Sequence, residues 1–247
     1  MRLRLLSYNI RFGGRPRASL IAGVIRDAQP DLVVFQEATD PRVIEQIAAE
    51  TGLTTWASRP SHSIGFVSRV PVLHHEWHYP RGARHSFLEI VLENEARVFG
   101  LHLKARFSKW SERRRAFEIR ALLDGIRRHQ EGFHVLVGDF NTLAPGELLD
   151  VERMPRWIRA LVWLSGRDIE RATIQIMLDA LYVDGYRRLH PDDKGYTFPV
   201  WDPHLRLDYI FLPAALTPNL LSCEVINTEQ ASKASDHFPL LSELKID

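Results

Sequence analysis

The stretch Gly138-Asp139-Phe140-Asn141 places an acid and an amide two positions apart, directly after the largely apolar run His134-Val135-Leu136-Val137. A short apolar run that ends at a glycine is typical of a buried strand. Side chains two positions apart on an extended chain share one face, so Asp139 and Asn141 would point toward the same ligand. Ligands of α/β proteins usually bind at the ends of such strands. An Asx-rich turn is the common alternative, and this stretch alone does not separate the two.

Polar residues also end other apolar runs along the chain. Asn9 follows Leu5-Leu6-Ser7-Tyr8, and Glu37 follows Leu32-Val33-Val34-Phe35-Gln36. Near the C-terminus, Arg206-Leu207-Asp208-Tyr209-Ile210 precedes the motif Ser235-Asp236-His237. Taken together and in this order, these motifs resemble the endonuclease/exonuclease/phosphatase superfamily of metal-dependent phosphoesterases. The signature of that superfamily is an early Asn, a Glu after an apolar strand, GDFN, an (R)xDY(I) strand and a terminal SDH.

The resemblance implies a fold that the hydrophobic pattern does not specify. Periodicity alone predicts a mixed α/β protein. The superfamily fold is a single-domain four-layer sandwich, an α/β (α+β) architecture in which two packed mixed β-sheets are flanked by helices. We therefore expect one domain over residues 1–247, with a helical insertion at about residues 146–182 that the motifs do not cover.

The resemblance also implies hydrolysis of a phosphoester by direct attack of water, with Mg²⁺ or Mn²⁺ as cofactor. Phosphodiesters are anionic and repel hydroxide, and a divalent cation neutralises that charge. Mg²⁺ prefers oxygen ligands and keeps several waters, so one or two carboxylates suffice to hold it. Carried onto this chain, the metal ligands would be Glu37, Asn9 and Asp236.

The remaining motif residues would be catalytic. Asp139 would act as general base toward the water or hold a second metal, and Asn141 would orient the phosphate or that water. His237, protonated, would stabilise negative charge that develops on the phosphoryl group. Asp208 would fix the tautomer of His237 and raise its pKa. His102 would contact the phosphate from the other side.

The context of His102 allows two interpretations. His102 stands in Leu101-His102-Leu103, which resembles a family strand, although a strand histidine bonded only for structural reasons is the alternative reading. Some nucleases of the superfamily pair this histidine with an acid in the preceding strand. The segment Arg84-His85-Ser86-Phe87-Leu88-Glu89 aligns no acid clearly, so His85 is the candidate for that place.

The amino-acid composition limits the kinds of protein to which the chain can belong. The chain has 247 residues, 45% hydrophobic and 26% charged, which are globular values. Its single cysteine, Cys223, excludes an internal disulfide and a cysteine-based zinc site. The formal net charge of +1 gives no global positive field. No apolar run is long enough to span a membrane and the N-terminus resembles a strand, so we expect a cytoplasmic monomer without a transmembrane segment.

The substrate stays open among a nucleic acid, a phospholipid and a small phosphate ester. The predicted helix Trp110–Gln130 places Arg113, Arg114, Arg115 and Arg120 on its outer face, as a solvated surface or as a rim for a polyanion. The apolar segment Met154–Leu164 contains Trp157 and Trp163, and either packs on the core or touches lipid.

A catalytically silent binding or scaffold module of the same fold is the alternative function. Such a protein would have lost some of the polar motif residues. All seven are present: Asn9, Glu37, Asp139, Asn141, Asp208, Asp236 and His237. The sequence therefore favours an enzyme.

Overall fold

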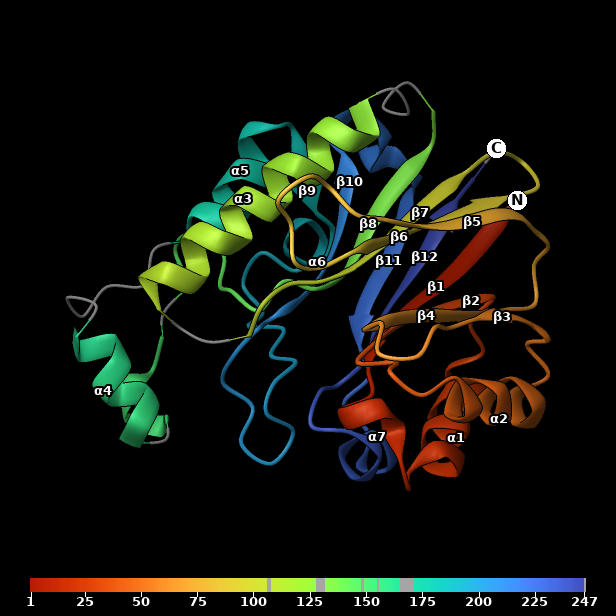
Figure 1. The fold of residues 1–247 in the computed structure, drawn as a ribbon, viewed down its shortest axis with the longest axis horizontal. Helices are drawn as coiled ribbons and strands as arrows, with labels where there is room; N and C mark the ends of the chain where they lie inside the picture. The colour runs from red at the N-terminus through yellow and green to blue at the C-terminus, as the bar shows by residue number, and fades with distance from the viewer. Residues whose placement is uncertain (106–107, 128–131, 148, 155, 165–170, 247) are drawn as a thin grey trace.

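The computed structural model describes the chain except residues 106–107, 128–131, 148, 155, 165–170 and 247, and the side chains at 157, 158, 161 and 164 (Figure 1). The strands are β1 (Arg2–Asn9), β2 (Leu32–Gln36), β3 (Thr55–Ala57), β4 (Ile64–Ser68), β5 (Val72–His78), β6 (Phe87–Leu92), β7 (Arg97–His102), β8 (His134–Asp139), β9 (Tyr182–Asp184), β10 (Asp208–Pro213), β11 (Leu220–Val225) and β12 (Leu240–Lys245). The α-helices are α1 (Ala18–Ala28), α2 (Pro41–Thr51), α3 (Lys109–Ile126), α4 (Arg156–Leu164), α5 (Ala172–Asp179), α6 (Gly185–Leu189) and α7 (Glu229–Ala234). Short 3₁₀ turns are η1 (Phe12–Gly14), η3 (Val151–Arg153) and η4 (Ala214–Asn219).

Two six-stranded sheets form the centre of the molecule, in the orders β11-β12-β1-β2-β4-β3 and β5-β6-β7-β8-β10-β9. Each sheet is mixed, because β1 pairs with β2 and β7 pairs with β8 in parallel, whereas β12 and β10 add antiparallel neighbours. The inner faces of the sheets share one apolar core, in which Val34 and Phe66 of the first sheet pack with Leu88, Val137 and Ile210 of the second.

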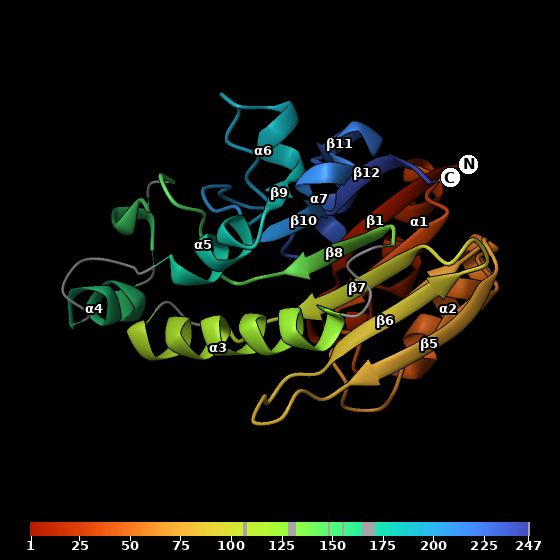
Figure 2. The ribbon, with the colours of Figure 1, turned by 90° about the horizontal axis from the view of Figure 1, so that it is seen from above.

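Helices cover the outer face of each sheet (Figures 1 and 2). Helices α1, α2 and α7 bury residues such as Ile21, Ile44 and Ala231 against the first sheet. Helices α3 and α5 bury residues such as Ile119 and Met177 against the second. The predicted sandwich of two mixed sheets flanked by helices is therefore confirmed.

Most helix boundaries follow the expected capping chemistry. Asp40 caps α2 by accepting a hydrogen bond from the Arg42 backbone N–H, and Gly52 closes that helix in a left-handed conformation. Ser108 caps α3, which begins close to the predicted start at Trp110. The predicted end of that helix at Gln130 lies outside the described residues.

The expected outer face of α3 needs one correction. Arg115 was predicted to face solvent, but it is fully buried and its Nη2 lies 2.8 Å from Glu112 Oε2. Arg114 keeps an exposed part and pairs with the buried Glu118 at 3.1 Å. Buried ion pairs of this kind break the simple rule that charged helix residues face water, because pairing offsets the cost of desolvation.

The short helix α6 begins at Gly185, directly after the last residue of β9, Asp184. The Asp184 side chain accepts a hydrogen bond from the backbone N–H of Arg187 at 3.2 Å, which is the geometry of a helix cap. Between residues 146 and 182 the described part contains η3, α4 and α5, and α4 stands apart from the sheets (Figures 1 and 2). That this segment is an insertion stays a prediction. None of the described helices has the length and apolar character needed to span a membrane.

Candidate active site

The strand pairing brings the polar strand ends to one edge of the sandwich. Asn9 ends β1 opposite Gln36 of the parallel strand β2, and Glu37 follows directly. In the other sheet Asp139 ends β8 opposite His102, the last residue of the parallel strand β7. Asp208 pairs with Asp139 from the antiparallel strand β10, whose first residue therefore lies at the same edge.

Asp139 lies at the centre of this group and is only 1% exposed. Its Oδ2 accepts a hydrogen bond from Asn9 Nδ2 at 3.0 Å. The Nε2 atoms of His102 and His237 lie 3.8 and 3.9 Å from the same oxygen. The other oxygen, Oδ1, accepts the backbone N–H of Asn141 at 2.8 Å. A single carboxylate thus faces two imidazoles, one at the end of β7 and one in the loop between α7 and β12.

Burial and charge set these three groups to different protonation states. Burial, reinforced by the nearby charge of Asp208, raises the pKa of Asp139 to about 7. Burial alone would lower the pKa of His237, but the charge and hydrogen bond of Asp208 overcome it and raise that pKa to about 10. Burial lowers the pKa of His102 to about 4. Near neutral pH the site therefore pairs a neutral imidazole with a protonated one.

Asp208 holds His237 in place. Its Oδ2 lies 2.8 Å from His237 Nδ1, so Nε2 of that ring turns toward Asp139. The ring of Phe198 lies 4.7 Å from the His237 ring and supports it from the side. Thr197 Oγ1 accepts the backbone N–H of Leu207 at 3.1 Å. The second oxygen of Asp208, Oδ1, is buried and has no hydrogen-bond partner among the described residues.

His102 has a partner that the sequence did not indicate. Ser63, in the loop before β4, contacts His102 Nδ1 through its Oγ, and the same oxygen accepts the Glu37 backbone N–H at 3.2 Å. His85, the candidate for this place, instead bonds Glu118 Oε2 at 2.9 Å. The expectation that His85 is the partner of His102 is therefore wrong, because the His85 side chain is bonded to Glu118 of α3 instead. A serine in a polar loop carries no pattern that would have identified it.

The acid and amide predicted as metal ligands lie together, and the second acid lies to one side. Glu37 Oε1 accepts from Asn9 Nδ2 at 3.4 Å, and Glu37 Oε2 accepts the Phe12 backbone N–H at 2.6 Å. Asp236 Oδ2 lies 3.3 Å from Arg11 Nε. Ser235 Oγ donates to the Asn9 carbonyl at 2.6 Å and ties the SDH motif to the end of β1. The ligand atoms offered here are the Glu37 carboxylate oxygens and Asn9 Oδ1, which accepts the Arg11 backbone N–H at 3.0 Å, and oxygens of these kinds fit a hard divalent cation.

A second group of possible metal ligands lies on the other side of Asn9. Asp139, Asp208 and His237 offer one ligand atom each, all within 4.8 Å of one another. Here a protonated His237 already places positive charge between two carboxylates. Near Glu37 and Asn9 the positive charge comes from guanidinium groups instead, Arg11 paired with Asp236 and Arg17 close to both Asp236 and Glu37.

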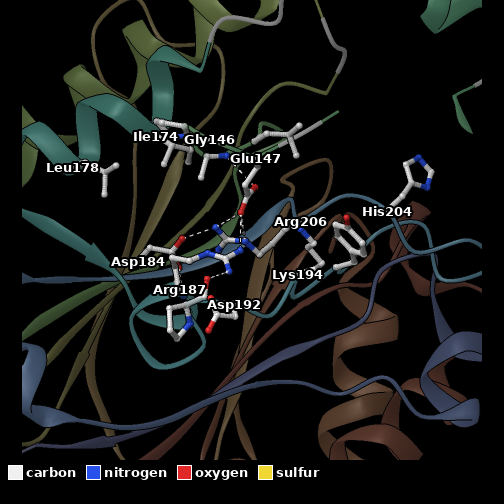
Figure 3. Close-up of a pocket in the computed structure, with 15 residues that line it drawn as sticks. Gly146, Glu147, Ile174, Leu178, Asp184, Arg187, Asp192, Lys194, His204 and Arg206 are labelled. Carbon is white, nitrogen blue, oxygen red and sulfur yellow. Dashed lines mark hydrogen bonds and ion pairs between the residues drawn. The ribbon is translucent and has the colours of Figure 1, made fainter. Parts of the chain in front are cut away.

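A cavity of about 450 Å³ lies beside the segments that leave β8 and enter β10, and no proposed site residue lines it (Figure 3). Leu143 and Arg206, which line it, stand two residues from Asn141 and Asp208 respectively. Arg206 Nη2 lies 2.6 Å from Glu147 Oε1 and 2.7 Å from Asp184 Oδ2. These paired charges anchor the chain that leads into β10. Sequence reasoning identified Arg206 but not its acidic partners, which lie 59 and 22 positions earlier in the chain.

Comparison with known proteins agrees with this arrangement. The model of the Endonuclease/Exonuclease/phosphatase family matches residues 6–237. The 3′ phosphatase NExo from Neisseria, solved with a product DNA hairpin, is 21% identical, with a TM-score of 0.73 over 99% of this chain and 100% of that one. An AP endonuclease from Archaeoglobus fulgidus is 17% identical, with a TM-score of 0.77 and coverages of 99% and 100%.

A humanized TDP2 from D. rerio is also similar, at 19% identity, with a TM-score of 0.68 over 99% of both chains. At these identities the solved structures show a shared fold. No curated protein matches the chain.

Proposed function

Because the chain belongs to the endonuclease/exonuclease/phosphatase family, as its motifs predicted, we propose that it is a Mg²⁺-dependent phosphodiesterase that hydrolyses nucleic acid by direct attack of water. Membership of the family makes it a hydrolase of phosphoester bonds. The observation that carries the proposal is the buried Asp139 carboxylate with an imidazole on each side. A nucleic acid substrate is supported by neighbours of the same fold, a phosphatase solved with product DNA and an AP endonuclease.

Asp139 is the proposed general base. A carboxylate with a pKa of about 7 is a stronger base than an ordinary one, yet is largely ionised above neutral pH. It takes a proton from the attacking water as the new O–P bond forms and the bond to the leaving oxygen breaks. Asn9 Nδ2 and the Asn141 backbone N–H hold the two carboxylate oxygens and leave little freedom for rotation.

His237 is the proposed stabiliser of developing charge. With a pKa of about 10 it is protonated at neutral pH, and its Nε2 proton points away from Asp208 toward the centre of the site. An imidazolium placed there donates to a phosphoryl oxygen as negative charge grows. Asp208 acts through His237 by fixing its tautomer and keeping it charged.

His102 and Asn141 are the proposed positioning groups for the phosphate. His102 is neutral, and contact with Ser63 at Nδ1 fixes the direction of Nε2. Asn141 lies at φ +52° and donates from Nδ2 to the Leu103 carbonyl at 2.9 Å. That bond joins the GDFN loop to the end of the His102 strand, so both groups keep one geometry relative to Asp139.

The proposed ligands of the metal are Glu37 and Asn9. Asp236 would join them only after Arg11, its ion-pair partner, moves away from it. Bound Mg²⁺ would neutralise phosphate charge and polarise the P–O bonds. We prefer this position to the cluster of Asp139, Asp208 and His237, because the protonated His237 would have to lose a proton before it could bind a cation. Phe12 donates its backbone N–H to Glu37 and orients that carboxylate before any ion arrives.

A hydrolysis panel tests the proposal. The purified chain is incubated with Mg²⁺, Mn²⁺ or EDTA and with single-stranded, double-stranded and abasic DNA, RNA, sphingomyelin, inositol phosphates and a chromogenic phosphodiester. We expect hydrolysis of at least one nucleic acid and of the chromogenic ester, with Mg²⁺ and not with EDTA. Hydrolysis of sphingomyelin alone would contradict the nucleic acid assignment, and inactivity in every arm would favour the silent binding module.

A phospholipid substrate is the second candidate, and one observation favours it. Trp163 of α4 is 63% exposed, while its neighbour Val162 is buried against Leu143 and Leu205 beside the site. Helix α4 therefore presents an indole to solvent from a position joined to the catalytic loop. The side chain of Trp157, the other tryptophan of this segment, lies outside the described residues. The lipid arms of the panel separate the two candidates.

A further inference from the structure

The outer face of α3 repeats an aromatic residue and an arginine. Trp110 is 83% exposed and Phe117 is 43% exposed, and each is followed three positions later by an exposed arginine, Arg113 or Arg120. Positions three and seven apart lie on one side of a helix. The two aromatic–arginine units are thus separated by two turns, or roughly 10 Å at 1.5 Å per residue.

The loop between β5 and β6 adds further positive charge to this face. Arg81 and Arg84 are exposed on it, and Figure 1 shows the loop passing across α3. Arg114 Nη2 donates to the Gly82 carbonyl at 2.7 Å and holds the loop on the helix. Glu118 accepts the Arg84 backbone N–H at 3.1 Å. The loop and the helix therefore form one fixed surface.

The arginines of this surface are free to bind an anion. The carboxylates of α3 are already engaged: Glu112 by Arg115, Glu118 by His85 and Arg114, and Asp124 by Arg127. Within the described residues, no ion pair joins a carboxylate to Arg81, Arg84, Arg113 or Arg120. Because the whole chain carries a net charge of only +1, this face is locally far more positive than the rest.

The surface begins beside the catalytic edge. Arg115 Nη1 donates to the carbonyl of Lys104 at 2.7 Å, two residues after His102. Glu112 Oε2 accepts from Thr142 Oγ1 at 2.9 Å, one residue after Asn141. The first two turns of α3 are thus bonded to both strands that carry the site, so a chain held on this helix leads toward Asp139.

We propose that a strip on this face binds a single-stranded segment of the nucleic acid substrate, an inference that rests on the proposed function. The strip is formed by Arg81, Arg84, Trp110, Arg113, Phe117 and Arg120. The arginines contact phosphates, and the rings of Trp110 and Phe117 stack on bases. Aromatic platforms interleaved with basic groups are how single strands are held without sequence preference.

A lipid surface fits the strip less well. Membrane-binding helices present a broad apolar face. The aliphatic residues of α3, such as Ile119, Leu122 and Ile126, are buried on the second sheet, and Trp110 and Phe117 are its only large exposed hydrophobic residues. The Trp110 ring, and the Phe117 ring with the Arg114 guanidinium 5.7 Å from its centroid, suit bases joined by phosphates.

Binding without turnover tests the strip. A short fluorescein-labelled single-stranded oligonucleotide is titrated with the full chain in EDTA, and anisotropy gives Kd over a range of salt concentrations. Trp110→Ala should raise Kd about 5–100-fold, the loss of one stacked base. The double variant Arg113→Gln/Arg120→Gln should weaken binding and lower the salt slope by roughly 1.4, or 0.7 for each phosphate contact.

The control is a double variant of two exposed arginines elsewhere, Arg42→Gln on α2 and Arg188→Gln on α6. It should keep the wild-type Kd and slope, and all variants should keep the wild-type kcat on the chromogenic ester. Wild-type Kd in the strip variants, or equal weakening in the control, would overturn the proposal. Loss of binding to anionic phospholipid vesicles with the oligonucleotide Kd unchanged would overturn it in favour of lipid. If the strip binds the oligonucleotide but no ester is hydrolysed, the proposed function fails and the strip stands.

Discussion

The strand-end site and the α3 strip present charge in opposite ways. At the site Asp139 and Asp208 are each 1% exposed and His237 is 5% exposed, and all three contact one another. On the strip Arg113 and Arg120 face solvent and carry no described ion pair. Buried groups that interact with one another acquire shifted pKa values. Solvated cations attract an anion from a distance.

The contrast assigns different kinetic roles to the two regions. Groups that exchange protons or stabilise charge only in the transition state should change kcat. Groups that hold the substrate equally before and during reaction should change KM. Each variant below therefore has a predicted signature as well as a predicted size.

Asp139→Asn should give the largest effect. The change keeps the shape of the side chain but removes its charge and its ability to take a proton, and loss of a general base typically costs about 10²–10⁴-fold in rate. We expect kcat to fall by that factor, with KM close to wild type, in steady-state assays on the chromogenic ester. Activity within tenfold of wild type would remove Asp139 from the role of base.

Glu37→Gln should shift the metal requirement. The amide keeps the size of the side chain but loses the negative charge proposed to hold Mg²⁺. We expect the Mg²⁺ concentration for half-maximal rate to rise at least about 10–100-fold, the cost typical even of outer metal partners. The matched variant Asp236→Asn tests whether the acid paired with Arg11 also contributes to Mg²⁺ affinity. An unchanged Mg²⁺ titration in Glu37→Gln would show that the metal is held elsewhere.

Asp208→Asn should move the alkaline limb of the pH–rate profile. The carboxylate of Asp208 raises the pKa of His237 to about 10. The proposed mechanism requires the protonated ring, so activity should be present below that pKa and lost above it. Without the charge the limb should shift to lower pH, and the rate deficit should be greatest at alkaline pH. A lower rate with an unmoved limb would mean that Asp208 serves structure alone.

Ser63→Ala should have the smallest effect. The serine hydroxyl orients a neutral imidazole by one hydrogen bond, and such bonds contribute about 0.5–1.5 kcal/mol, or about 2–10-fold in rate. We expect kcat to fall in that range. His85→Ala is the control and should leave kcat unchanged, because His85 bonds Glu118 instead. A larger fall in kcat for His85→Ala than for Ser63→Ala would restore His85 as the partner of His102.

The sequence predicted most of the polar residues that the structure brings together, because they stand at the ends of buried strands. Asn9, Asp139 and Asp208 each adjoin an apolar run whose direction is fixed by packing, so motif and strand identify them together. The sandwich followed from the family resemblance, since periodicity alone gives only the class. The short strand β9 and helix α6 have too few residues to show a hydrophobic period in the sequence.

Tertiary pairing is what the sequence could not supply. Ser63 meets His102 across 39 positions, through a loop without a motif. Periodicity placed Arg115 on the outer face of α3, but an ion pair with Glu112 draws it inside. The strip depends on which arginines of the α3 face have an ion pair among the described residues, and no local pattern determines that. Local patterns predict which side chains are polar, and three-dimensional contacts decide which remain available.

The pH–rate profile of the wild-type enzyme on the chromogenic phosphodiester tests the central assignment most directly. Asp139 must be ionised and His237 protonated, so kcat/KM should rise through an apparent pKa well above the ordinary carboxylate value of 3.8 and fall near 10. Replacing the strip arginines should leave both limbs in place. An acidic limb at the ordinary carboxylate value, or a rate that stays constant through pH 10, would contradict the pairing of a buried base with a buried imidazolium.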